Sequence, residues 1–257
     1  ALAEAARVVG AAQIRGMATV GGAIASGLRC QFHDQSPFWR RALGPCLREG
    51  SDRCHATGGG DCVATQACDL PVALAALDAT VEARGPEGAR TAAVTELYGD
   101  DGLAHLALER GEVVTGALLP WRSTALRGTY RKLRLRKAVD RPLIGIGIAG
   151  AVDRHRVVQE LRVAACGVGP AVRLVPGLEP FLGCHLDEAL CAALGRAVAR
   201  WARPSPALRI DAAWRRCMAG VLVERGFLAV LRDAIDGPRQ VGRRAPSRSD
   251  SDTMTEV

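Results

Sequence analysis

Residues 67–88, ACDLPVALAALDATVEARGPEG, contain a helix start, a short helix and a hairpin turn, and this order decides the fold. Asp69 stands at the position of an N-cap, and the apolar run after it predicts a helix over residues 70–77. The Gly-Pro-Glu-Gly sequence beyond the helix predicts a turn between strands at residues 80–84 and 89–94. A short helix followed by paired strands is typical of an α+β protein.

On the N-terminal side, residues 14–25 read IRGMATVGGAIA and carry the pair Gly21-Gly22. Residues 2–12 predict a helix, and the glycine pair predicts a turn that enters a second one. Paired glycines let backbone N–H groups approach a phosphate group or a flavin ring closely. The same pair also suits a tight turn between packed elements, so the residues alone leave both interpretations open.

On the C-terminal side, the pattern changes from strands to helices. Residues 112–119 are a further strand candidate, and the polar tail at 237–257 predicts disorder because it has almost no apolar content. After Pro120 the chain predicts an antiparallel meander and then two helices, at residues 130–138, 143–152, 157–168, 187–202 and 211–235. We therefore expect an α+β fold with a domain boundary near residues 121–127.

The composition excludes several classes of protein. The 257 residues are 48% hydrophobic, which suffices for a sizeable core, and no stretch approaches the roughly 18 apolar residues of a membrane span. The net charge of +7 permits an acidic partner, but 27 acidic residues are interleaved with 34 basic ones, so we expect no nucleic-acid binding. Nine cysteines, an odd number, favour free thiols and a cytoplasmic location.

Four cysteines lie in a stretch with little hydrophobic periodicity, at spacings of 16, 8 and 8 residues: Cys30, Cys46, Cys54 and Cys62. A loop of this length usually needs a function or a ligand to order it. Structural zinc sites and the better-known iron–sulfur signatures use close cysteine pairs, which are missing here. Spacing alone therefore leaves two interpretations, a set of free thiols or a metal site. His55, beside Cys54, is expected to lie outside the ligand set.

Three stretches together resemble one family: residues 14–25, the four-cysteine stretch with DQSPFWRRALGPCLREGSDRCHA and DDGLAHLAL, and residues 67–88. The chain resembles the flavin-binding subunit of the xanthine oxidase family of molybdenum hydroxylases. More narrowly, it is similar to the β subunit of 4-hydroxybenzoyl-CoA reductase. The likeness runs from Leu2 to about Ala234.

The resemblance implies two cofactors. The narrower relative binds a [4Fe-4S] cluster in an insertion that corresponds here to residues 29–65, with Cys30, Cys46, Cys54 and Cys62 as ligands. FAD would contact the glycine turn and two further positions, the Asp-Leu motif and a Tyr-x-Lys pattern. These FAD contacts are Thr19, Val20, Gly21, Gly22, Ala23, Asp69 and Lys132.

The resemblance also implies an architecture of three parts. Residues 1–123 would form the second lobe of a two-lobed FAD-binding domain with the cluster-binding insertion. Residues 124–236 would form a C-terminal domain of antiparallel sheet and helices, and residues 237–257 a tail. The first FAD lobe would come from a preceding segment or another polypeptide. The family usually has Asn where this chain has Ala23, and Arg-Asn where it has Arg15-Gly16.

By resemblance, the function is electron transfer within an oxidoreductase complex of aromatic metabolism. Electrons would pass between a ferredoxin-like carrier, the cluster, FAD and the [2Fe-2S] clusters of a second subunit. Substrate chemistry would occur at the molybdenum cofactor of a third subunit, so we expect no catalytic residue here. Four arginines near the cysteines would attract an acidic ferredoxin or would simply be solvated: Arg29, Arg40, Arg41 and Arg48.

Two other functions compete with this interpretation. One is a non-catalytic scaffold subunit that is stabilised by zinc and has lost flavin binding, favoured by Ala23 and by the missing lobe. The other is a basic nucleic-acid-binding module, supported only by the isoelectric point near 9.2 and by the arginines of the tail.

Overall fold

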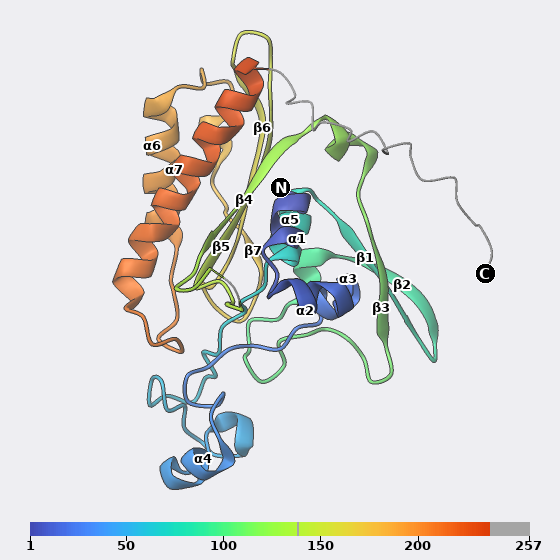
Figure 1. Cartoon of the computed structure of the whole chain (residues 1–257), viewed down its shortest axis with the longest axis vertical. Helices are drawn as coiled ribbons and strands as arrows, with labels where there is room; N and C mark the ends of the chain where they lie inside the picture. Colours follow the sequence, from blue (N-terminus) through green and yellow to red (C-terminus); the bar gives the residue numbers. More distant parts are fainter. Residues whose placement is uncertain (138, 237–257) are drawn as a thin grey trace, which may run out of the picture.

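The protein is built around two antiparallel sheets, shown in Figure 1. The structure is a computed structural model and describes residues 1–137 and 139–236. The first sheet has the strand order β2-β1-β3 and the second β4-β5-β6-β7. The strands are β1 (Thr80–Gly85), β2 (Gly88–Ala93), β3 (Val113–Leu118), β4 (Arg127–Leu133), β5 (Ile144–Val152), β6 (Val158–Cys166) and β7 (Arg173–Leu174).

Helices cover both faces of the second sheet. The long helices α6 and α7 pack on one face, and α5 packs on the other beside the N-terminal helices. The helices are α1 (Leu2–Arg7), α2 (Ala12–Met17), α3 (Val20–Ile24), α4 (Pro37–Leu43), α5 (Leu70–Ala76), α6 (Glu188–Trp201) and α7 (Ala212–Asp236). The expected mixture of helices and sheets is confirmed.

The sequence of β5, IGIGIAGAV, explains how one sheet supports two cores. Ile144, Ile146 and Ile148 are fully buried on the face toward α6 and α7. Glycines alternate with them and leave the opposite face flat, so α5 approaches the strand closely. A Cβ atom added at Gly147 would lie only 2.7 Å from the carbonyl oxygen of Val72 in α5.

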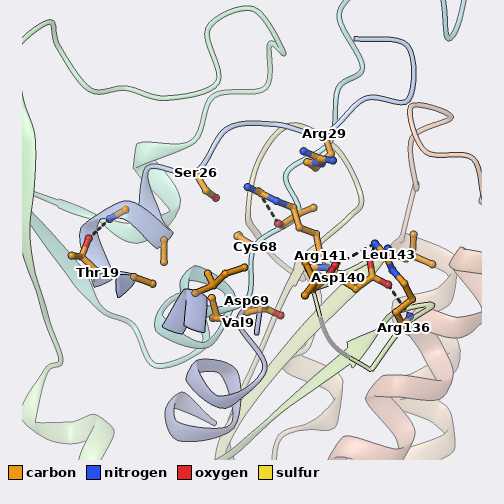
Figure 2. A pocket seen from close by; sticks show the side chains of 18 of the residues that line it. Val9, Thr19, Ser26, Arg29, Cys68, Asp69, Arg136, Asp140, Arg141 and Leu143 are labelled. Carbon is orange, nitrogen blue, oxygen red and sulfur yellow. Dashed lines mark hydrogen bonds and ion pairs between the residues drawn. The ribbon is translucent and has the colours of Figure 1, made fainter. Parts of the chain in front are cut away.

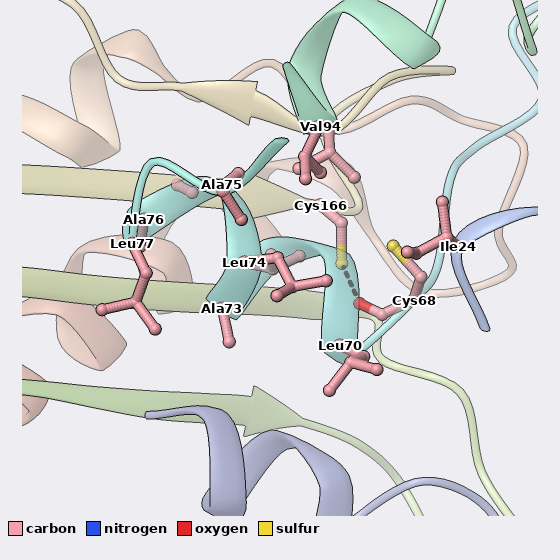
Figure 3. Packing of buried hydrophobic residues seen from close by; sticks show 14 of the residues in the cluster. Ile24, Cys68, Leu70, Ala73, Leu74, Ala75, Ala76, Leu77, Val94 and Cys166 are labelled. Carbon is pink, nitrogen blue, oxygen red and sulfur yellow. Dashed lines mark hydrogen bonds between the residues drawn. The ribbon is translucent and has the colours of Figure 1, made fainter. Parts of the chain in front are cut away.

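Helix α5 is buried all round, from Leu70 to Ala76. Its core includes two further cysteines, Cys68 and Cys166, as Figure 3 shows. The Cys166 thiol donates to the Cys68 carbonyl oxygen at 3.0 Å. Both thiols therefore act as small core side chains.

Three details differ from the sequence-based expectations. The helix expected over residues 2–12 is interrupted, because Gly10 has a φ of +48° and separates α1 from α2. The cysteine stretch contains α4, which the Ser36 hydroxyl caps by accepting from the Trp39 amide at 3.3 Å. Strand β4 ends at Leu133 instead of residue 138. The expected disorder of residues 237–257 falls outside the described residues.

The four-cysteine stretch forms a projecting lobe, seen at the bottom of Figure 1. We call residues 29–65 the cysteine lobe. Its two ends meet in an isolated antiparallel bridge, in which Arg29 and Thr65 exchange two hydrogen bonds of 2.8 Å. The Gln31 amide donates to the Ala207 carbonyl at 2.7 Å, which attaches the base of the lobe to the segment after α6.

We expect Gly147→Ala to lower the free energy of unfolding by about 1–3 kcal/mol, because the new methyl group forces α5 away from β5. Gly116→Ala in β3 is the matched control, since nothing lies within 4 Å of a Cβ there. This control should leave stability unchanged or raise it by up to about 1 kcal/mol. Urea denaturation followed by circular dichroism measures both, and equal stability of the two variants would contradict the packing described.

Candidate functional site

A large cavity, of about 720 Å³, lies where the N-terminal helices meet the loop after β4. Figure 2 shows Thr19 on one side, Arg141 and Leu143 on the other, and Cys68 and Asp69 between them. The Ser26 hydroxyl oxygen at this cavity is buried and has no hydrogen-bond partner among the described residues. A cavity of this size with an unsatisfied polar group suits a bound organic molecule.

The glycine pair belongs to the short helix α3 instead of the turn that the sequence predicted. Thr19 caps this helix, and its hydroxyl accepts from the Gly22 amide at 3.0 Å. In the described part of the chain, the amides of Val20 and Gly21 donate to no protein atom. First-turn amides of this kind favour negatively charged ligand groups.

The residues of this segment face different surroundings. Thr19, Gly22 and Ala23 line the large cavity, whereas Val20 lines a smaller neighbouring one of about 340 Å³. Gly21 lies against β3, where an added Cβ would approach the Val114 carbonyl oxygen to 2.6 Å. The paired glycines thus combine one position at the cavity with one that lets α3 contact the first sheet.

Asp69 does not cap α5, contrary to the expectation from sequence. Its side chain makes no cap hydrogen bond and instead accepts from the Tyr130 hydroxyl at 2.8 Å and from Lys132 Nζ at 2.9 Å. Tyr130 and Lys132 are two residues apart on β4, so both reach the same side of the strand. Lys132 also donates to the Val8 carbonyl at 3.0 Å.

The Asp69–Lys132 pair is buried, with 7% and 4% of the respective side chains exposed. Burial raises the pKa of the Asp69 carboxyl, while Lys132 and Tyr130 oppose that rise. Asp69 lines the large cavity, whereas Lys132 lines a separate hollow beyond it. Lys132 therefore reaches the cavity only through the carboxylate that it holds.

Arg141 was missed by the sequence analysis. It donates to the carbonyls of Gly27 and Ala67 at 3.3 and 3.5 Å, and it lines the cavity beside Arg29. Burial and the charge of Arg29 lower the pKa of its guanidinium. The two arginines give this wall of the cavity a positive charge. No sequence signal marked Arg141, because an arginine before a proline in a loop is unremarkable.

The four lobe cysteines are the only buried residues between positions 29 and 63. Each has at most 9% of its surface exposed, while the lobe's Phe38 is 77% exposed. A phenylalanine side chain gains more free energy from burial than a thiol does, because its apolar surface is larger. The interior of the cysteine lobe is therefore organised around sulfur.

Backbone amides point at three of these thiols. Burial raises the pKa of Cys30, and the amides of Phe32 and His33 oppose that rise. Burial acts in the same direction on Cys54, but hydrogen bonds from Ala56, Val63 and Thr57 outweigh it and lower the pKa of this thiol. Burial also raises the pKa of Cys62, opposed by the Ala64 amide.

Three of the four thiols influence one another electrostatically. Cys54 contributes to the raised pKa values of Cys30 and Cys62, and Cys30 contributes to that of Cys62. The Cys46 sulfur lies 3.9 Å from Nδ1 of His33, and a Glu49 carboxylate oxygen lies within 4.8 Å of both atoms. Among these thiols only Cys54 has a lowered pKa, which favours the thiolate form that metal and cluster ligands require.

His55, predicted to lie outside the ligand set, contacts the backbone and an aromatic ring of the lobe. Its Nε2 is 3.1 Å from the Gly44 carbonyl oxygen, and its ring lies 6.1 Å from the ring of Phe32 at an angle of 51°. It therefore supports the lobe's backbone.

Two protein families match this chain. Residues 1–122 match the FAD binding domain in molybdopterin dehydrogenase, and residues 128–230 match the CO dehydrogenase flavoprotein C-terminal domain. The aldehyde oxidoreductase FAD-binding subunit PaoB of Escherichia coli is 34% identical over 146 residues, which are 52% of this chain and 45% of PaoB. The chain thus spans less than half of the length of this relative.

Solved structures share the fold. Carbon monoxide dehydrogenase from Hydrogenophaga pseudoflava superimposes with a TM-score of 0.66 at 23% identity, over 90% of this chain and 66% of that one. Quinoline 2-oxidoreductase from Pseudomonas putida 86 gives 0.58 at 20% identity, over 65% of this chain and 57% of that one. At these identities the comparison establishes the fold.

We expect Asp69→Asn to destabilise the protein by about 3–5 kcal/mol, because it leaves the Lys132 ammonium buried without an opposite charge. The double variant Asp69→Asn, Lys132→Met should recover much of this loss. Glu82→Gln, in the exposed pair with Arg84, is the control and should cost at most about 1 kcal/mol. Denaturant titration of these variants and of Lys132→Met alone gives the coupling energy between Asp69 and Lys132. A double variant whose loss of stability equals the sum of the two single losses would contradict a buried pair.

Proposed function

From the homology of this chain to the FAD-binding subunits of molybdenum hydroxylases, we propose that it is an electron-transfer flavoprotein subunit of an oxidoreductase of that type. Two features on one molecule support this. The cavity beside α3 offers a place for a flavin, and the cysteine lobe offers four buried sulfurs. The burial of the four cysteines, which are the only buried residues between positions 29 and 63, is the observation that carries the proposal.

The residues around the cavity fit part of an FAD molecule. The guanidinium groups of Arg29 and Arg141 provide donors and positive charge for phosphate. Thr19, Gly22, Ala23 and Asp69 would contact the cofactor along the cavity, and Lys132 would fix the Asp69 carboxylate. When bound, FAD supplies the exchange of electrons between one-electron and two-electron carriers.

The cysteine lobe fits a [4Fe-4S] cluster with Cys30, Cys46, Cys54 and Cys62 as thiolate ligands. The amide groups directed at three of the sulfurs stabilise negative charge there. Such hydrogen bonds, with limited exposure to solvent, are the protein's means of tuning a cluster's potential. The bound cluster would exchange single electrons.

The complex around this chain is part of the proposal. The chain would assemble with a molybdenum-cofactor subunit and a [2Fe-2S] subunit and exchange electrons with a ferredoxin-like carrier, in 4-hydroxybenzoyl-CoA reductase-like aromatic metabolism. Substrate chemistry would belong to the molybdenum subunit. The odd number of nine cysteines agrees with a reducing compartment such as the cytoplasm. Within the described residues, no helix has the length and apolarity needed to cross a membrane.

A zinc-stabilised scaffold subunit is the second candidate. The proximity of His33, Cys46 and Glu49 favours it, because these residue types also bind zinc. The metal content of the protein separates the two candidates.

We expect anaerobically purified protein to contain about four irons per chain with acid-labile sulfide, as a [4Fe-4S] cluster requires. Cys54→Ala should lose most of the iron, whereas Cys217→Ala, at an exposed thiol on α7, should retain it. Metal, sulfide and flavin analysis on the same samples measures both cofactors. Stoichiometric zinc without iron would overturn the cluster and favour the scaffold.

Gly102→Ala should also lower the iron content, because Gly102 lies directly against Cys62. A Cβ at Gly102 would sit 2.6 Å from the Cys62 sulfur and 2.5 Å from its carbonyl oxygen. Gly60→Ala is the control, since a Cβ there meets nothing within 4 Å. We expect at least a twofold loss of iron in the first variant only. Equal iron in both would exclude Cys62 from the ligands.

A further inference from the structure

Arg48 occupies an unusual place in the cysteine lobe. It lies two residues after Cys46, in the single turn of 3-10 helix Leu47–Glu49. One of its terminal nitrogens, Nη1, is buried and has no hydrogen-bond partner among the described residues. A guanidinium nitrogen withdrawn from water without an acceptor is costly, so an acceptor is expected there.

The charge of Arg48 acts on residues of the lobe and on a residue of the body next to it. Burial and then the charge of Arg48 lower the pKa of His33, beside Cys46, and the same charge opposes the burial that raises the pKa of Cys62. It also acts on His105 from the β2–β3 connection, whose pKa is lowered first by burial. The His105 Nε2 atom is likewise buried without a partner. Arg40 Nε is a third such atom, so the lobe and the residues next to it hold three buried nitrogen atoms without a partner among the described residues.

The nearby carboxylate does not satisfy Arg48. Glu49 binds Arg40, with an Nη1–Oε1 distance of 2.6 Å. The other carboxylate of the lobe with an ion pair, Asp34, binds Arg29 at 3.1 Å and the Cys30 amide at 3.0 Å. Both acidic groups therefore already have cationic partners.

We propose that Arg48 donates its buried N–H groups to the sulfur atoms of the bound cluster and compensates the negative charge of that cluster. This inference rests on the [4Fe-4S] cluster of the proposed function. Four thiolate ligands carry four negative charges, and reduction of the cluster by one electron adds another. A fixed guanidinium favours the reduced form, because a positive charge at short range in a poorly solvated site stabilises added negative charge. Arg48 is thus a positioning and tuning residue.

The test compares reduction potentials, measured by redox titration of the purified protein with electron paramagnetic resonance detection. We expect Arg48→Gln to shift the reduction equilibrium at least tenfold toward the oxidised cluster, which corresponds to about 59 mV for one electron. Arg48→Lys should shift it less, because the charge remains. Arg41→Gln is the matched control: Arg41 is an exposed arginine of the same lobe and should leave the potential unchanged.

The outcomes distinguish a failure of the proposed cluster from a failure of the proposed role of Arg48. A wild-type protein without iron overturns the proposed cluster itself. An Arg48→Gln protein with normal iron and a wild-type potential overturns the role of Arg48 and leaves the cluster standing. If Arg48→Gln does not retain iron, Arg48→Lys decides: retention there supports charge compensation, and loss in both folded variants overturns it. Circular dichroism establishes that each variant is folded.

Discussion

The buried contact of Asp69 with Lys132 and Tyr130 holds the two halves of the molecule together. Asp69 begins α5, which leads into the first sheet, and its partners lie on the first strand of the second sheet. Lys132 adds the N-terminal segment through Val8. A buried ion pair contributes little net stability, but any arrangement that separates its members leaves a bare charge. The pair therefore fixes the positions of α5, β4 and the N-terminal segment relative to one another, and these positions determine the shape of the cavity.

The cysteine lobe follows a different physical rule from the body of the protein. The body is stabilised by apolar burial on both faces of the second sheet. The lobe buries four thiols and leaves large apolar side chains such as Phe38 in solvent. If the lobe binds the proposed cluster, we expect its folding and cofactor binding to be coupled. Arg48 agrees with this expectation, because its buried nitrogen has no acceptor among the described residues.

Local pattern predicted the elements that depend on local chemistry. Helix α5, the hairpin of β1 and β2, and the strands β5 and β6 begin within one residue of their predicted positions. Local sequence pattern did not predict contacts between residues that are far apart in the sequence. The N-cap role of Asp69 was wrong because Tyr130 and Lys132, more than 60 positions away, compete for its carboxylate. The place of Arg141 at the cavity depends equally on carbonyls from distant segments.

The bridge between Arg29 and Thr65 makes the cysteine lobe a separable module. The chain leaves the body and returns to it at adjacent points, so the intervening length adds only a slowly growing entropic cost. An ancestral subunit with a short turn at this place could have acquired the whole lobe in one step without repacking either core. The same geometry makes the lobe a cassette for grafting onto a related fold, where it would add the electron-transfer centre proposed for it.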